Sequence, residues 1–186
     1  MTESAPSVWL VGLSGAGKST VGPLLAQRLG YDFVDLDARV EELAGEAIPD
    51  LFRTGGEPLF RRFEAAATSE TRCLGRTVVA AGGGWMARSD LEREWEGCTR
   101  VWLRVGPETA IHRLRSFAAS GRPLLDAPDP LGSLKALLAE REAAYSKAEL
   151  TVDTDARSPV EVAKEVVRKL EMAGARSAGK QEIEKS

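Results

Sequence analysis

The residues with the clearest capacity for chemistry form one continuous stretch near the N-terminus. Residues 12–19 read Gly-Leu-Ser-Gly-Ala-Gly-Lys-Ser and match the pattern G-x-x-x-x-G-K-[ST]. The glycines of such a loop let backbone N–H groups turn toward phosphate oxygens, and the start of the following helix adds partial positive charge. Lys18 would neutralise the β and γ phosphates of a nucleotide, and Ser19 would ligate Mg²⁺. The alternative is a glycine-rich turn that precedes Lys-Ser by chance. We expect contacts to a nucleotide from Gly15, Ala16, Gly17, Lys18, Ser19 and Thr20.

A pair of carboxylates, Asp35 and Asp37, is the next candidate. They follow a short apolar segment that is typical of a buried strand, and residues two apart at a strand end can point the same way. One carboxylate would then face a metal ion and the other an acceptor hydroxyl. A solvated pair of aspartates at the end of a strand is the alternative.

Two further features could contribute to an acceptor site. Arg61 and Glu64 are three residues apart in a predicted helix, so the carboxylate could orient the guanidinium; the alternative is an exposed ion pair, which the spacing alone favours. Residues 82–84 are three consecutive glycines at the end of a predicted strand. They would let a ligand approach the backbone closely, or would simply form a sharp turn.

The elements that must position these residues alternate between strand and helix. This alternation predicts an α/β fold in which a five-stranded parallel sheet has helices on both faces and ligands bind at the carboxyl ends of the strands. We expect Pro23 to kink the first helix or loosen its first turn. The expected strands are residues 8–11, 33–35, 77–81, 99–105 and 151–153. The expected helices are residues 18–29, 36–44, 49–55, 57–74, 107–114, 130–149 and 158–170.

Length and composition restrict the class of protein. The 186 residues suit one domain, which we place at residues 1–172, with a short lid at about 115–129 and a disordered polar tail at 173–186. With 25 basic and 28 acidic side chains the net charge is −3, so there is no excess of positive charge for binding nucleic acid, and a small molecule is the expected ligand. The chain contains no asparagine, which excludes the guanine-specificity motif Asn-Lys-x-Asp and weakens a protein-kinase interpretation.

Cysteine and histidine are scarce. Two cysteines and one histidine cannot form a zinc cluster or a disulfide framework, which favours a reducing compartment. The polar N-terminal residues 1–7 do not resemble a signal peptide, and no apolar run approaches the length of a membrane span. We therefore expect a cytoplasmic protein without a membrane partner, and a monomer.

Taken together and in order, these motifs resemble those of shikimate kinase, a family of small P-loop kinases. The similarity extends from about residue 8 to residue 170 and has family-like spacing throughout. It rests on residues 12–20, Asp35 with Asp37, the segment from Gly56 to Glu64, the glycines 82–84, residues 122–125 (Arg-Pro-Leu-Leu), and Arg141 with Tyr145.

The resemblance implies transfer of the ATP γ-phosphoryl group to the 3-hydroxyl of shikimate, with ATP and Mg²⁺ as cofactors, in the pathway to chorismate and the aromatic amino acids. It implies that Asp37 is the base, that Asp35 organises Mg²⁺ through water, and that Glu64 supports Arg61. The implied shikimate contacts come from Asp37, Arg61, Gly83 and Arg141. The implied nucleotide contacts outside the loop are Arg122, a catalytic residue that reaches the phosphates from the lid, and Arg157 at the adenine, with Arg115 a weaker candidate for the phosphates.

Two features depart from the family pattern. Trp85 and Met86 follow the glycine triplet where small or aliphatic residues are usual, and Pro23 interrupts the helix after the phosphate loop. We interpret Trp85 as a packing residue rather than a ligand contact. The rival interpretations are a gluconate or nucleoside monophosphate kinase, which shares the loop and a lid, and a nucleotide-binding switch with slow hydrolysis.

Overall fold

The central element of the molecule is a five-stranded sheet. The computed structural model describes residues 6–88, 97–116 and 127–183, with side chains up to residue 174. In these residues the strand order is β2-β3-β1-β4-β5 and every neighbouring pair is parallel, as the sequence predicts. The strands are β1 (Val8–Val11), β2 (Asp32–Asp35), β3 (Thr77–Ala80), β4 (Thr99–Arg104) and β5 (Leu150–Asp153).

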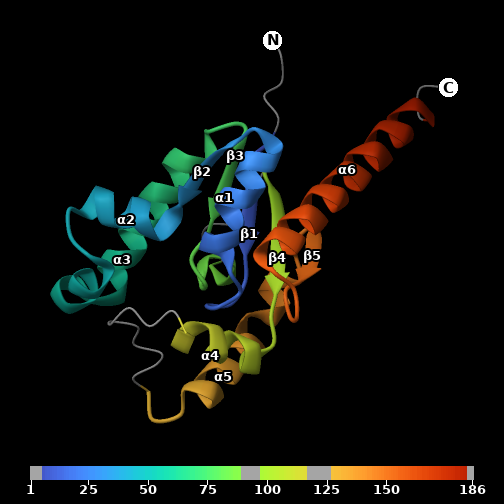
Figure 1. The fold of residues 1–186 in the computed structure, drawn as a ribbon. Helices are drawn as coiled ribbons and strands as arrows, with labels where there is room; N and C mark the ends of the chain where they lie inside the picture. The colour runs from blue at the N-terminus through green and yellow to red at the C-terminus, as the bar shows by residue number, and fades with distance from the viewer. Residues whose placement is uncertain (1–5, 89–96, 117–126, 184–186) are drawn as a thin grey trace.

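Helices cover both faces of the sheet (Figure 1). Along β1, Val8 and Leu10 pack in one hydrophobic cluster with α1 and α6, whereas Trp9 and Val11 pack in a second cluster with α2 and α3. This alternation follows from the two-residue period of a strand, so one short apolar run contributes to two cores. The helices are α1 (Lys18–Leu29), α2 (Leu36–Ala44), α3 (Ile48–Arg72), α4 (Pro107–Ser116), α5 (Pro130–Tyr145) and α6 (Pro159–Ile183), with a 3₁₀ turn η1 (Trp85–Ala87).

The helix α3 contains the break that its sequence predicts. Gly56 has φ 66° and ψ −165°, outside the helical region, so α3 consists of two helical segments that abut at this glycine. A residue with a Cβ would be strained in this conformation. Because of this kink, the second segment, which carries Arg61 and Glu64, does not continue the axis of the first. The predicted short helix before residue 56 and the predicted helix after it are therefore both present.

Two helices differ from the expectation in length or regularity. The helix α1 runs without interruption from Lys18 to Leu29 although Pro23 lies inside it. The helix α6 passes the expected end at residue 170 and reaches Ile183, whereas we expected a disordered tail from residue 173. The segment contains alanine, arginine, lysine and glutamate, which favour helix, and its two glycines lower this tendency without abolishing it.

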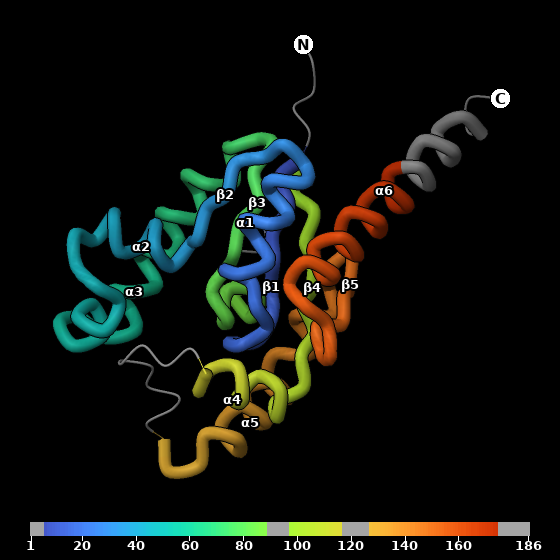
Figure 2. Tube along the Cα trace, in the orientation of Figure 1, coloured from blue at the N-terminus to red at the C-terminus, as the bar shows by residue number. Residues whose placement is uncertain are grey.

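The carboxyl ends of all strands meet at one edge of the sheet, which Figure 1 draws downward with α4 and α5 below it. Figure 2 shows α2 and the start of α3 to one side of this edge, while α6 leads away from it. The register aligns Asp35 with Ala80 and Ala80 with Leu10, so the segments after β2, β3 and β1 leave the sheet at nearly the same level. In such a sheet this edge is the usual place for a ligand.

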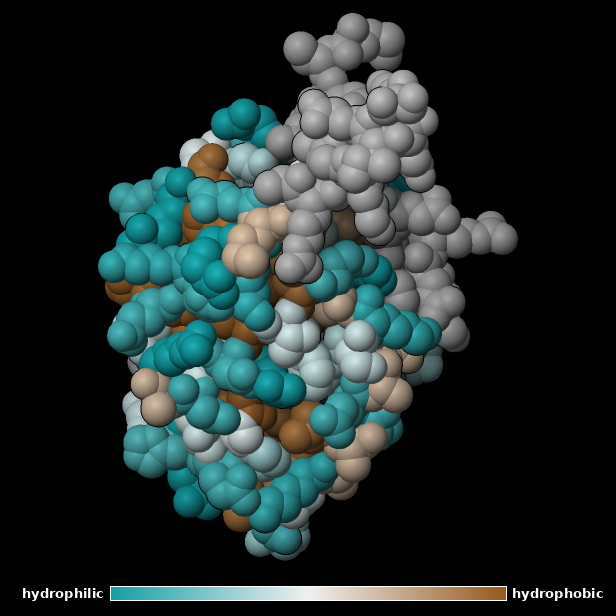
Figure 3. Space-filling model, turned by 90° about the vertical axis from the view of Figure 1, so that its right-hand side faces the viewer, coloured by the Kyte–Doolittle hydropathy of each residue, from teal (hydrophilic) through white to brown (hydrophobic). Residues whose placement is uncertain are grey.

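The face drawn in Figure 3 is mostly hydrophilic, with hydrophobic residues scattered among polar ones. Such scattered apolar residues are normal on a surface in contact with water. Among the residues that the structure describes, no helix is both long and apolar enough to cross a bilayer.

Candidate active site

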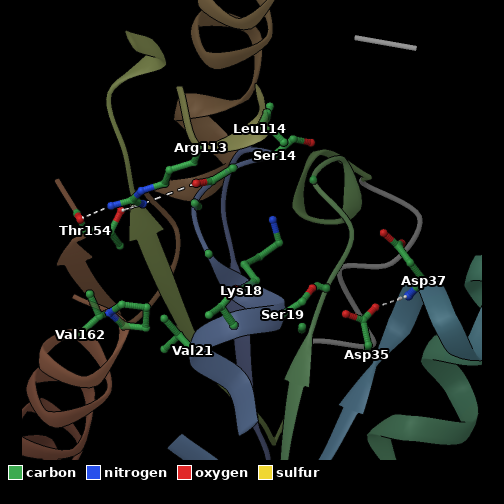
Figure 4. A pocket seen from close by; sticks show the side chains of 18 of the residues that line it. Ser14, Lys18, Ser19, Val21, Asp35, Asp37, Arg113, Leu114, Thr154 and Val162 are labelled. Atoms are coloured by element: carbon green, nitrogen blue, oxygen red, sulfur yellow. Dashed lines mark hydrogen bonds between the residues drawn. The ribbon is translucent and has the colours of Figure 1, made fainter. Parts of the chain in front are cut away.

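A cavity of about 830 Å³ opens at the carboxyl edge of the sheet (Figure 4). It is large enough for a nucleotide with part of a second small molecule. Segments from several helices, strands and their adjoining loops meet around it, so residues far apart in the sequence become neighbours. The predicted site residues that line it are Gly15, Ala16, Gly17, Lys18, Ser19, Thr20, Asp35, Asp37, Gly83 and Arg157.

The loop between β1 and α1 forms one wall of this cavity. Gly15 has φ +83°, and a Cβ on it would lie 2.7 Å from the carbonyl oxygen of Ala110, so only glycine fits this turn. The ammonium of Lys18 donates to the carbonyl oxygens of Gly12 at 2.7 Å and Leu13 at 3.1 Å. Burial lowers the pKa of Lys18 to about 8, against the opposing effect of the carboxylates Asp37 and Asp35. The side chain is therefore still mostly charged at neutral pH and its charge is poorly solvated.

Asp35 and Asp37 lie side by side at the cavity, but their surroundings differ (Figure 4). Asp35 ends β2 and caps α2, since one carboxylate oxygen accepts from the backbone N–H of Asp37 at 3.1 Å and of Ala38 at 3.4 Å. Asp37 lies in the first turn of α2 and lines the cavity; the residue is exposed to it, but the protein atoms around the cavity still remove part of the solvent from its carboxylate. This desolvation, with the adjacent charge of Asp35, raises the pKa of Asp37 to about 6, and Lys18 partly offsets the rise. At neutral pH the group is ionised and basic enough to accept a proton.

The donor set around the loop suits Mg²⁺. Ser19 and Asp35 both line the cavity and offer a hydroxyl and a carboxylate oxygen, the hard ligands that this ion prefers. In the described part of the chain no three His, Cys, Asp or Glu residues gather into a metal cage. Mg²⁺ commonly keeps several waters and takes only one or two protein ligands beside phosphate oxygens, so this sparse set fits it.

The glycine triplet after β3 brings the remaining predicted residues together. A Cβ on Gly84 would lie 3.4 Å from Nη2 of Arg61 and 3.7 Å from Cζ of Arg141, so both guanidinium groups border this glycine. A Cβ on Gly83 would lie 3.7 Å from Nη1 of Arg141. The triplet is thus a place of close approach rather than only a turn, and Arg61 and Arg141 meet beside the cavity although 80 positions separate them in the sequence. The buried Nε of Arg141 has no hydrogen-bond partner among the described residues.

The Arg61–Glu64 pair is more than an exposed ion pair. Glu64 has a side-chain exposure of 2%, and its Oε2 accepts from Nη1 of Arg61 at 2.8 Å. On its other side Arg61 donates from Nε and Nη2 to the exposed carboxylate of Glu57. Glu64 is therefore buried behind Arg61, as expected for a residue that orients it.

Arg113 and Thr154 line the cavity but are not among the site residues that the sequence predicts. Arg113 donates to the Thr154 hydroxyl at 3.0 Å and to the Thr154 carbonyl at 2.6 Å, and both residues line the cavity beside Arg157. The helical spacing of α4 could have indicated Arg113. It lies three residues after the buried Ala110, and therefore on the inner face of the helix. Arg115, two residues further on, lies on the exposed face.

Of the other predicted residues, Arg122 lies outside the described residues, as does most of the predicted lid. Trp85 is fully buried, stacks on Trp9 with a centroid separation of 4.6 Å, and donates from its indole N–H to the hydroxyl of Thr68 at 3.0 Å. Its interpretation as a packing residue is confirmed.

Comparison with known proteins gives a consistent result. The family model described as shikimate kinase matches residues 14–171. A shikimate kinase of Symbiobacterium thermophilum is 43% identical over 173 residues, which cover 91% of this chain and 99% of that protein. The solved structure of shikimate kinase from Acinetobacter baumannii in complex with shikimate is 31% identical with a TM-score of 0.86, over 92% of this chain and 96% of that one. A gluconokinase from Sinorhizobium meliloti is 20% identical with a TM-score of 0.66, over 94% and 97% of the two chains, and shares the fold.

Proposed function

Because the chain belongs to the shikimate kinase family, we infer that it transfers the γ-phosphoryl group of ATP to the 3-hydroxyl of shikimate, giving shikimate 3-phosphate and ADP. It is a transferase of the shikimate pathway, which leads to the aromatic amino acids. The observation that carries this function is the coverage of the resemblance: the match to relatives includes nearly the whole chain, the phosphate loop lines the cavity, and both arginines lie beside it.

The phosphate half of the reaction falls to the loop and Lys18. Backbone N–H groups of residues 15–20 would receive the phosphate oxygens, and the start of α1 adds its partial positive charge. Lys18 would exchange its contacts with the carbonyls of Gly12 and Leu13 for contacts with the β and γ phosphates. Its charge then opposes the negative charge that spreads over the transferred group in the transition state. Arg113 and Arg157 border the part of the cavity beyond the loop, where the adenine would lie.

The acceptor half falls to Asp37, Gly83, Arg61 and Arg141. The two guanidinium groups beside Gly84 would hold the carboxylate of shikimate, since arginine offers paired N–H donors to a carboxylate. Asp37 would accept a hydrogen bond from the reacting hydroxyl and take its proton as the oxygen attacks phosphorus. Its pKa of about 6 leaves it ionised at neutral pH and able to do so.

We propose Mg²⁺ as the metal of this site, with Ser19 as a direct ligand and Asp35 bound through water. The bound ion would bridge phosphate oxygens and withdraw charge from them. Arg122, by resemblance, would bring a further positive charge to the phosphates from a lid at about residues 115–129.

The remaining expectations concern the setting of the enzyme. We propose that it works as a monomer, and that it is cytoplasmic, because a chain with only two cysteines suits a reducing compartment. Sedimentation equilibrium of the purified chain at micromolar concentration tests the first proposal; a stable dimer would overturn it.

A coupled assay that measures ADP release tests the function itself. We expect ADP formation from ATP and Mg²⁺ to depend on shikimate and to be negligible with gluconate or AMP as acceptor. Phosphorus NMR of the product should show one new phosphate monoester. Turnover with AMP or gluconate that exceeds turnover with shikimate would replace the acceptor, and slow hydrolysis unaffected by any acceptor would favour a nucleotide-binding switch.

A further inference from the structure

The carboxylate of Glu64 is shared between two arginines. Its Oε2 accepts from Nη1 of Arg61 at 2.8 Å and from Nη1 of Arg88 at 2.9 Å. The same Nη1 of Arg88 also approaches the backbone carbonyl oxygen of Arg61 at 3.2 Å. Arg88 directly follows η1, and its own backbone N–H donates to the carbonyl of Trp85. One guanidinium therefore connects the segment after the glycine triplet to the helix that carries Arg61.

The charges of this cluster make Arg88 more than a structural connection. Arg61 lies between the carboxylates of Glu57 and Glu64, so these three side chains together carry a net negative charge. Such a group would repel an anionic acceptor. Arg88 cancels the excess, and Arg141 then makes the whole cluster positive. The side chain of Arg88 is only 15% exposed, so solvent screens its interaction with Glu64 weakly.

The geometry indicates how Arg61 would respond to the loss of Arg88. Glu64 is buried and has to be compensated by a donor. Without Arg88, the ion pair with Arg61 would have to compensate this carboxylate, and the guanidinium would be drawn toward Glu64 and away from Gly84. The carbonyl of Arg61 would also lose a donor. Both changes act on the residue that borders the acceptor site.

We propose that Arg88 is a positioning residue for the acceptor: by holding Glu64 and the backbone of Arg61 it keeps the Arg61 guanidinium available for the acceptor carboxylate. The proposal rests on the shikimate kinase function, in which that carboxylate is the ligand of Arg61. In this proposal Arg88 acts through Glu64 and Arg61 and not by contact with a substrate.

The test separates acceptor binding from turnover. Arg88→Gln should raise KM for shikimate about tenfold, which corresponds to about 1.4 kcal/mol, while kcat and KM for ATP stay within about twofold. Arg88→Lys keeps a charge beside Glu64 and should restore KM to within about threefold of wild type. Arg88→Met removes the charge but retains much of the side-chain bulk, and should behave as Arg88→Gln does; it also replaces Arg88→Gln in the test if that variant does not fold.

Arg100→Gln is the matched control. Arg100 has nearly the same side-chain exposure, 14%, and pairs with Glu149, but it lies at the amino end of β4, at the opposite edge of the sheet. It should lower the melting temperature without changing KM for shikimate. If Arg88→Gln did the same, Arg88 would be a structural residue only and the proposal would be wrong.

A double-mutant cycle tests whether Arg88 acts through Arg61. In the double variant Arg61→Lys/Arg88→Gln, the rise in KM for shikimate should be smaller than the product of the two single effects. Both substitutions affect the same contact, that of residue 61 with the acceptor carboxylate. Multiplicative effects would overturn the proposed connection. Absence of shikimate turnover in the wild type would instead refute the function, so the two failures are distinguishable.

Discussion

The two ends of the cavity prepare for their ligands in different ways. At the phosphate end, one loop supplies backbone N–H groups and a single ammonium, and burial lowers the pKa of Lys18 to about 8. At the acceptor end, the cations are arginines, and Arg61 is held by two carboxylates. The cation at the phosphate end, Lys18, is thus compensated poorly by the folded protein, whereas Arg61 at the acceptor end is paired with carboxylates.

This difference has a physical origin in the ligands. A nucleotide with Mg²⁺ brings many charges of its own, so the loop needs an unpaired cation that can move from protein carbonyls to phosphate oxygens. A single carboxylate brings one charge, and its recognition depends on orientation. A guanidinium held by ion pairs, as that of Arg61 is, provides that orientation, because its geometry is set before the ligand arrives. We therefore expect substitution of Lys18 at the phosphate end to affect mainly kcat, and substitution of the arginines at the acceptor end to affect mainly KM.

The largest effect should come from Lys18→Met. Methionine fills the space but cannot neutralise phosphate charge, so kcat should fall by about 10³-fold or more, the upper range for loss of one transition-state contact. The fold should persist, because the replaced charge was poorly solvated. Steady-state kinetics and far-UV circular dichroism check both points.

Lys169→Met is the control for this variant. Lys169 also donates to a backbone carbonyl, that of Thr151 at 2.7 Å, but at the start of β5 and away from the cavity. Its kinetics should remain those of wild type. A Lys18→Met enzyme with native structure and a rate within about tenfold of wild type, or about 1.4 kcal/mol of barrier, would show that the phosphate-loop assignment is wrong.

Asp37→Asn should follow, with a loss of about 10²-fold or more in kcat, the usual contribution of a positioned base. Part of the loss will reflect orientation of the hydroxyl, because phosphoryl transfer has a loose transition state. Affinity for ATP should change little by isothermal titration calorimetry. Asp32→Asn, the same change at the exposed amino end of β2, is the control. Loss of ATP binding together with activity would move Asp37 to the nucleotide side.

A smaller effect, confined to KM, should result from Arg61→Lys and Arg141→Lys. Lysine keeps the charge but not the paired donors, and each charge-assisted bond contributes about 1.5–3 kcal/mol, so KM for shikimate should rise about tenfold or more. KM for ATP should stay nearly constant. An analogue with a neutral hydroxymethyl group in place of the carboxylate separates the explanations: wild type should use it poorly and the variants no worse. Equal losses on both acceptors would indicate that the arginines serve the phosphates or the fold.

The contrast between the two ends also decides what the sequence could predict. The phosphate loop is one contiguous stretch after an apolar strand, so local pattern alone located it and the sheet followed from the alternation of elements. The acceptor end is assembled from α3, α5 and the segment after β3. Spacing could suggest the Arg61–Glu64 pair, but the position of Arg141 came from resemblance.

The site features that could not be predicted from the sequence depend on tertiary contacts. Nothing in the local pattern distinguishes Arg88 from the other arginines, because its partner Glu64 is 24 positions away. Thr154 and Arg113 are similarly brought together by the packing of α4 beside the end of β5. The helix α6 ends at Ile183 and not at the predicted residue 170. The polar segment after residue 170 contains no proline, and its helix propensity is high enough to extend the helix.

The smallest effect is on stability, and its sign tests whether the folded protein compensates the charge of Asp37 poorly. The pKa of Asp37 is raised from 3.8 to about 6 in the folded protein, so between pH 4 and 6 the folded state holds this proton more tightly than the unfolded chain does. Stability from this group is therefore present at low pH and lost as the pH rises through about 6.

Asparagine cannot ionise, so Asp37→Asn should match wild type near pH 4 and become progressively more stable than wild type toward pH 7. Thermal unfolding without ligands at several pH values measures the difference. Arg88→Gln, which breaks a buried pair at the acceptor end, should be less stable than wild type at neutral pH, the opposite sign. If Asp37→Asn were destabilised at neutral pH, or if its difference from wild type did not change with pH, the charge of Asp37 would be well compensated in the fold, and its contrast with the paired charges of Arg88 and Glu64 would fail.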